Sequence, residues 1–135
     1  MKALLTIVIV LLSACGMRSS ASIIGDIDNL VMEPFYRWKS SPTASCESKE
    51  LFESVRLAKA VAANTDRLDM RQRSAMYQLE IADGALNKKC VDFADVVYRD
   101  VIKVFVGLAY GGYRQRAEIG LADVREARQS AAKAK

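Results

Sequence analysis

The sequence contains no histidine, which removes the side chain most often used as a general base and as a neutral metal ligand. It also lacks a Gly-x-Ser-x-Gly elbow, a P-loop and a Cys-x-x-Cys pair, which are common signatures of hydrolases, nucleotide-binding enzymes and thiol oxidoreductases. Acidic pairs one helical turn apart occur at Asp92/Asp95 and Glu80/Asp83, but such pairs are common on exposed helix faces. We therefore expect a protein that is not an enzyme, with no catalytic residue, metal ligand, cofactor or small-molecule substrate.

Long blocks of one charge are also absent. The chain has 20 basic and 16 acidic side chains, so its net charge is only +4. The most arginine-rich stretch, Tyr113–Arg128, is interrupted by Glu118, Asp123 and Glu126. This mixture is typical of a solvated helix face, and we expect no nucleic-acid partner.

No uncharged apolar run approaches the roughly 20 residues that cross a bilayer. A shorter run, Ala3–Leu12, follows the charged start Met1-Lys2, as in a secretory signal. It leads into Leu12-Ser13-Ala14-Cys15, which resembles the lipobox of bacterial lipoproteins, where the cysteine thiol is acylated and becomes the mature N-terminus. The alternative is an ordinary secretory signal with an incidental cysteine.

The lipobox interpretation predicts where the protein resides. Acyl chains on Cys15 would hold it at a membrane. Gly16 follows that cysteine, whereas lipoproteins retained at the inner membrane typically carry aspartate there, so we expect the periplasmic face of the outer membrane. The predicted organisation is a signal peptide (1–14), a lipidated cysteine with a short tether (15–22), a helical domain (23–130) and a frayed tail (131–135).

Two cysteines remain once Cys15 is assigned to the lipid, namely Cys46 and Cys90. An even remainder in an exported protein suggests a disulfide, and two free buried thiols are the alternative.

Apolar spacing predicts an all-α protein, a small bundle of four to five helices with one disulfide. Valine-rich segment 90–110 could form a strand, but its length favours a helix. The expected elements are a helix from Ile23 that Pro34 interrupts or kinks, followed by an aromatic cluster, then helices from Cys46 to Asn64, Arg67 to Asn87, Cys90 to Tyr110 and Tyr113 to Arg128.

The helix order supports the disulfide independently. The second and third expected helices are joined by a short turn and should be antiparallel. Cys46 opens one and Cys90 follows the other, so both should lie at the same end of this hairpin. A bond there would close a loop of about 45 residues and stabilise the fold by roughly 4 kcal/mol in the chain-entropy model.

Three short motifs carry a family resemblance, in order along the chain. They are Phe35–Lys39 (FYRWK) shortly before Cys46, Ser74–Leu79 (SAMYQL) in the hairpin, and Lys89–Phe93 (KCVDF). Together with the lipobox, this order resembles the pilotins of type II secretion systems (the PulS/OutS type), from Phe35 to about Phe105. The chain departs from that family in its extra helical segment after Gly111-Gly112.

The resemblance implies a function. Pilotins bind a C-terminal segment of the secretin, which is disordered alone and helical when bound, and carry the secretin to the outer membrane through their lipid anchor. A bundle of this kind can leave an apolar groove for such a helix. The alternative is an exclusion or structural lipoprotein of a conjugation machine or another envelope machine. Our candidate groove residues, which could instead form the core, are Phe35, Tyr36, Trp38, Phe93 and Val97.

Overall fold

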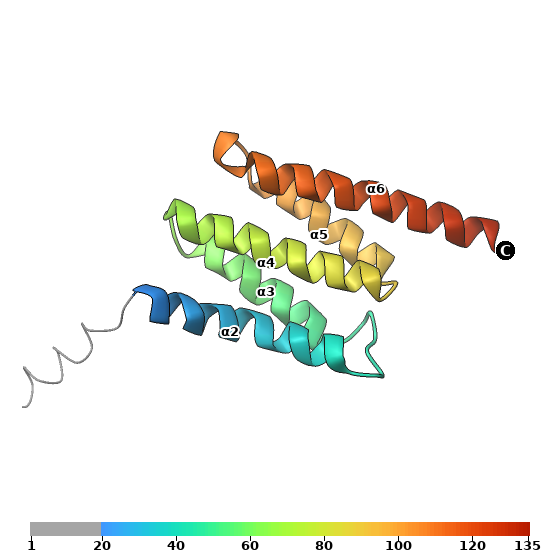
Figure 1. Ribbon diagram of the computed structural model, residues 1–135, viewed down its shortest axis with the longest axis horizontal. Helices are drawn as coiled ribbons and strands as arrows, with labels where there is room; N and C mark the ends of the chain where they lie inside the picture. Colours follow the sequence, from blue (N-terminus) through green and yellow to red (C-terminus); the bar gives the residue numbers. More distant parts are fainter. Residues whose placement is uncertain (1–19) are drawn as a thin grey trace, which may run out of the picture. The chain divides into compact units, whose positions relative to one another are not determined.

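The computed structural model describes residues 20–135, with side chains from residue 24 onward. The predicted signal peptide and Cys15 lie outside the described residues. All regular structure from residue 20 to the C-terminus is helical, so the predicted all-α bundle is confirmed and no strand forms in segment 90–110. The helices are α2 (Ser20–Ser40), α3 (Lys49–Ala63), α4 (Leu68–Asn87), α5 (Val91–Val104), the short 3₁₀ helix η1 (Leu108–Tyr110) and α6 (Gly111–Lys133) (Figure 1).

The chain divides after Leu30 into two compact units, and the second, Val31–Lys135, contains the helical bundle. Within it, successive helices from α3 to α6 run antiparallel (Figure 1). Helix α4 packs against α3, α5 and α6, and α5 also packs against α6. None of the described helices combines the length and apolar character needed to cross a membrane.

The core of this unit follows the apolar stripes that predicted its helices. In α3 the inner residues recur every three or four positions, which places them on one face. The same pattern recurs in α5 and α6. Fully enclosed large side chains are Phe35, Leu51, Tyr77, Leu79, Ile81, Tyr98, Val101, Phe105 and Val124.

Two buried glycines let large rings reach a neighbouring helix. The ring of Phe35 lies against Gly84 of α4, and the ring of Tyr98 lies against Gly120 of α6. A methyl group on either glycine would overlap the ring. Glycine costs about 1 kcal/mol in a helix interior relative to alanine, and here the close approach accounts for its presence.

The predicted disulfide is present. Cys46 and Cys90 are bonded, with their Cα atoms 5.2 Å apart. Cys46 lies in the turns before α3, and Cys90 immediately precedes α5, so the bond joins the entrances of these two helices. Between α4 and α5, Lys89 adopts a left-handed conformation (φ 67°) and the Cys90 N–H donates to the Ala85 carbonyl at 2.9 Å, which reverses the chain.

Several helix boundaries differ from those expected. Helix α2 continues through Pro34 to Ser40, because the buried Phe35 and Trp38 stabilise the turn that follows the proline. Helix α3 begins at Lys49 rather than Cys46, after an extended Ser48.

The C-terminal boundaries also differ. Helix α5 ends at Val104, ahead of a break in which Gly107 has a φ of 104° that other residues rarely adopt. Helix α6 begins at Gly111, although the glycine pair was expected to lie outside it. It continues to Lys133, so most of the predicted frayed tail is helical, as the strong helix propensity of alanine and lysine allows.

Candidate functional site

An open groove lies between α3 and α5 at the disulfide end of the second unit. It encloses about 550 Å³ and includes both disulfide cysteines in its lining. Both walls are helical and mostly apolar, and each presents side chains three or four positions apart. The wall residues are Phe52, Val55 and Lys59 from α3, and Phe93, Val96 and Val97 from α5.

Aromatic side chains from the two walls meet across the groove. The rings of Phe52 and Phe93 are in edge-to-face contact, with centroids 5.2 Å apart and planes at 87°. Phe52 is nevertheless 55% exposed, and Val96 on the opposite wall is 58% exposed. Apolar surface therefore stays open on both walls of the groove.

Charged side chains of both signs surround the groove. Lys59 and Asp100 form an ion pair that connects α3 to α5. Glu47, Lys89 and Asp92 lie at the disulfide end. The charges therefore give the groove no strong preference for a cationic or anionic occupant.

The predicted partner-binding residues separate into two sets. Phe93 and Val97 line the groove, with Val97 almost fully buried at its wall. Phe35 and Trp38 are enclosed in the bundle, where the Trp38 indole donates to the Ser45 carbonyl at 2.8 Å. Tyr36 is exposed, and its hydroxyl donates to Glu80 at 2.8 Å. None of these three aromatic residues from α2 lines the groove.

Sequence reasoning missed Phe52 and Val96 as groove residues. Each directly neighbours a residue of the buried stripe, Leu51 in α3 and Val97 in α5. A large apolar residue beside a complete stripe widens the apolar face beyond what the core needs, and this signal could have identified both residues.

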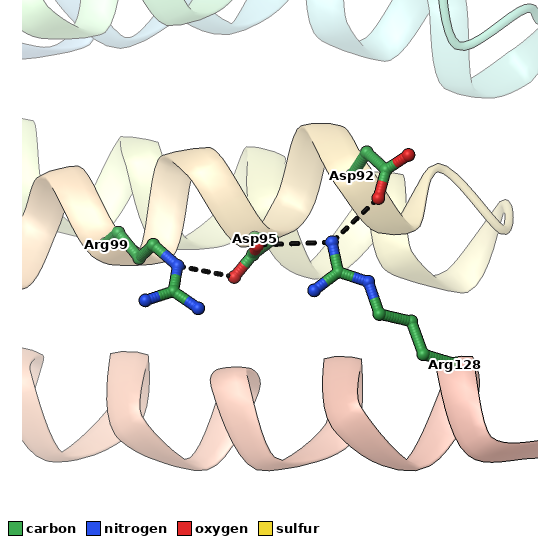
Figure 2. Close-up of polar contacts among 4 residues, drawn as sticks. All are labelled: Asp92, Asp95, Arg99 and Arg128. Carbon is green, nitrogen blue, oxygen red and sulfur yellow. Dashed lines mark hydrogen bonds and ion pairs between the residues drawn. The ribbon is translucent and has the colours of Figure 1, made fainter.

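Helix α6 is connected to the start of α5 by ion pairs (Figure 2). Arg128 donates to Asp92 at 2.7 Å and to Asp95 at 3.2 Å, and Asp95 also accepts from Arg99. The hydrogen bonds that Arg128 donates to Asp92 and Asp95 raise the pKa of its guanidinium. This acidic pair is therefore neutralised by arginine, in keeping with a structural role.

The second acidic pair, Glu80/Asp83, is also engaged. Glu80 accepts from Tyr36, while Asp83 accepts from Tyr98 at 2.6 Å and pairs with Arg116. Across residues 20–135 no group of three or more cysteine, aspartate or glutamate side chains is arranged to hold a metal ion.

Two larger hollows, one beside the turns before α3 and one between the end of α4 and α6, have more polar linings than this groove. Comparison with known proteins adds no relative: no family model, curated protein or solved structure matches this chain.

Proposed function

We propose that the protein is a pilotin, an outer-membrane lipoprotein whose α3/α5 groove binds the C-terminal segment of a type II secretion secretin as a helix. The observation that carries the proposal is the open apolar groove at the disulfide end, lined by Phe52, Phe93 and Val96. The lipobox at Cys15 and the pilotin-like order of motifs support the identity of the partner.

The helical walls of the groove support a helical occupant. The walls are two helices that present residues at i, i+3 and i+7 (Phe52, Val55, Lys59) and at i, i+3 and i+4 (Phe93, Val96, Val97). A third helix can place its own apolar stripe between such ridges. Because the surrounding charges are mixed, apolar contacts should dominate affinity, which should then depend little on salt.

Binding must also offset the ordering of a disordered segment, which costs about 2–5 kcal/mol. The large exposed side chains are therefore the expected hot spots. Titrating the mature protein with a secretin C-terminal peptide, followed by calorimetry and by the helical circular dichroism of the peptide, tests this directly. We expect helix formation on binding.

Variants locate the binding site. Phe52→Ala or Val96→Asp should weaken binding at least about tenfold, equivalent to about 1.4 kcal/mol. The matched control is Ile119→Ala on α6, an apolar side chain that is 57% exposed and lies outside the groove. An absence of binding at high micromolar peptide would refute the pilotin proposal. Equal effects of all three variants would refute only the groove as the site.

The lipid anchor is tested separately. Cys15→Ser removes the acylated thiol, so we expect the variant to be soluble in the periplasm while the wild type fractionates with the outer membrane. Unchanged outer-membrane association of the variant would contradict lipidation at Cys15.

A further inference from the structure

We propose that the connection between α5 and α6 is a membrane-contacting tip, whose side chains Val104, Val106 and Leu108 enter the interface of an anionic bilayer. The proposal rests on the lipid anchor of the proposed function, and it adds a second contact that orients the bundle on that membrane. The three side chains are 50%, 64% and 102% exposed, respectively. Leu108 is thus as exposed as in an extended peptide.

This exposure is fixed by the surrounding structure. Between the exposed residues, Phe105 is fully buried, and its ring lies 5.3 Å from that of Tyr110. The Tyr110 hydroxyl accepts from Arg71 of α4 at 3.2 Å, and the Ala109 carbonyl accepts from Gln72 at 2.9 Å. These contacts hold the connection against α4, while Val104, Val106 and Leu108 stay exposed.

Arg114 of α6 also holds the connection in place, through hydrogen bonds to the end of α5. Its guanidinium donates to the carbonyls of Ile102 and Phe105, which lie at the end of α5 and would otherwise lack helical partners. Gly107, with its φ of 104°, provides the backbone turn that directs the chain outward. The bundle buries Phe105 completely but leaves Leu108 fully exposed. Packing of the core therefore does not explain why a leucine stands at this position.

The charge around the tip favours a lipid surface. Residues 101–117 contain the basic side chains Lys103, Arg114 and Arg116 and no acidic one. Arg116 pairs with Asp83 and Arg114 donates to carbonyls at the end of α5, so the exposed Lys103 supplies the positive charge at the tip. A cation near an anionic membrane surface is stabilised by the negative surface potential. Apolar residues beside basic ones are typical of segments that lie at a bilayer interface.

The small size of the tip argues against a protein partner. Stable protein interfaces use about 20–30 residues on each side. The tip offers three large exposed apolar side chains, Val104, Val106 and Leu108. A small protrusion can enter a fluid interface without a complementary surface.

Chain length limits how far from the bilayer the second unit can begin. From Cys15 to the start of α2 the chain spans at most about 18 Å, at roughly 3.5 Å per residue. The helical residues from Ser20 to Val31 add about 17 Å, at 1.5 Å per residue. The second unit therefore begins within about 35 Å of the acylated cysteine, a distance similar to the diameter of a small domain.

Tryptophan probes test the contact in the full mature lipoprotein. The protein would be placed in vesicles of phosphatidylethanolamine and phosphatidylglycerol with brominated acyl chains, which quench indole fluorescence on contact. Trp38, the only native tryptophan, is 3% exposed and gives the background. The probes are Leu108→Trp and Val106→Trp, and the control is Gln129→Trp, an exposed position near the far end of α6.

We expect bromine quenching several-fold greater for both probes than for Gln129→Trp. Equal quenching in all three variants would overturn the proposal, as would a concentration-dependent blue shift of the probes without lipid, which would indicate a second copy of the chain. Secretin-peptide binding, measured on the same vesicles, reports on the pilotin proposal separately. If the tip probes are quenched but the secretin peptide does not bind, the pilotin proposal is refuted and the membrane contact stands.

Discussion

At the scale of single residues, Tyr98 shows how a polar group is accommodated in this core. Its ring is almost fully buried against Gly120, and its hydroxyl donates to Asp83 at 2.6 Å. Burial raises the pKa of this hydroxyl well above its usual value, and the hydrogen bond and negative charge of Asp83 raise it further. Tyr98 therefore remains protonated in the folded protein under conditions that ionise an exposed tyrosine.

This shift predicts a pH dependence of stability. An unfolded tyrosine loses its proton near pH 10, whereas folded Tyr98 retains it. Its contribution is therefore fully present below pH 10 and declines as the pH rises toward its higher folded pKa. Urea unfolding between pH 8 and about 11 should show a steeper loss of stability in the wild type than in Tyr98→Phe. Parallel profiles would contradict this assignment.

Residue-level prediction from sequence succeeded where spacing determines burial. The stripe Leu51, Val55, Ala58 and Ala62 is buried as its spacing predicts. The aromatic cluster after Pro34 was ambiguous, because both a core and a binding surface use large rings. Only tertiary packing against Gly84 settles that Phe35 belongs to the core.

At the scale of secondary-structure elements, α6 is held by two kinds of contact. Near its middle, Gly120 admits the Tyr98 ring, and toward its C-terminus Arg128 pairs with α5. Surface ion pairs are worth little, typically up to 1 kcal/mol. Packing at Gly120 and at the buried Ala117 and Val124 should therefore contribute more to the attachment of α6 than the ion pairs do.

Two glycine substitutions in α6 separate packing from helix propensity. Gly120→Ala should destabilise the protein by about 1–3 kcal/mol, because its methyl group would overlap the Tyr98 ring. Gly112→Ala, with no atom within 4 Å of the new methyl group, should stabilise by up to about 1 kcal/mol. Chemical denaturation measures both. Stabilisation by both changes would contradict the close approach.

The existence of the helices followed from the sequence more readily than their ends. The periodicity of segment 90–110 correctly favoured a helix over a strand, but α5 ends at Val104. Two features mark the end of α5, namely the left-handed Gly107 and the hydrogen bonds from Arg114 to carbonyls of α5. The position of Arg114 depends on the path of α6. Tertiary contacts of this kind are invisible to local periodicity.

At the scale of the whole molecule, the second unit places its two exposed apolar features on different parts of the bundle. The groove lies beside the disulfide at the start of α5, whereas the tip follows the end of that helix. The order of helices and the Cys46–Cys90 pairing were predictable from sequence, because a short-turned hairpin brings both cysteines to one end. The groove between α3 and α5 could not be predicted from the sequence, because it depends on how far apart those helices pack.

The disulfide should affect both stability and the groove, since Cys46 and Cys90 line the groove and tie the entrances of its two walls together. Replacing both with serine frees a loop with a sequence separation of 44 residues, so we expect a loss of roughly 4 kcal/mol in urea unfolding, with helical circular dichroism retained. Secretin-peptide affinity should fall as well, because the walls lose their shared constraint. Reduction of the wild type supplies the matched control, since it opens the bond without changing the sequence. If the double variant binds as tightly as the wild type while losing stability, the bond serves the fold alone and the groove is held by the packing of α3 and α5 on α4.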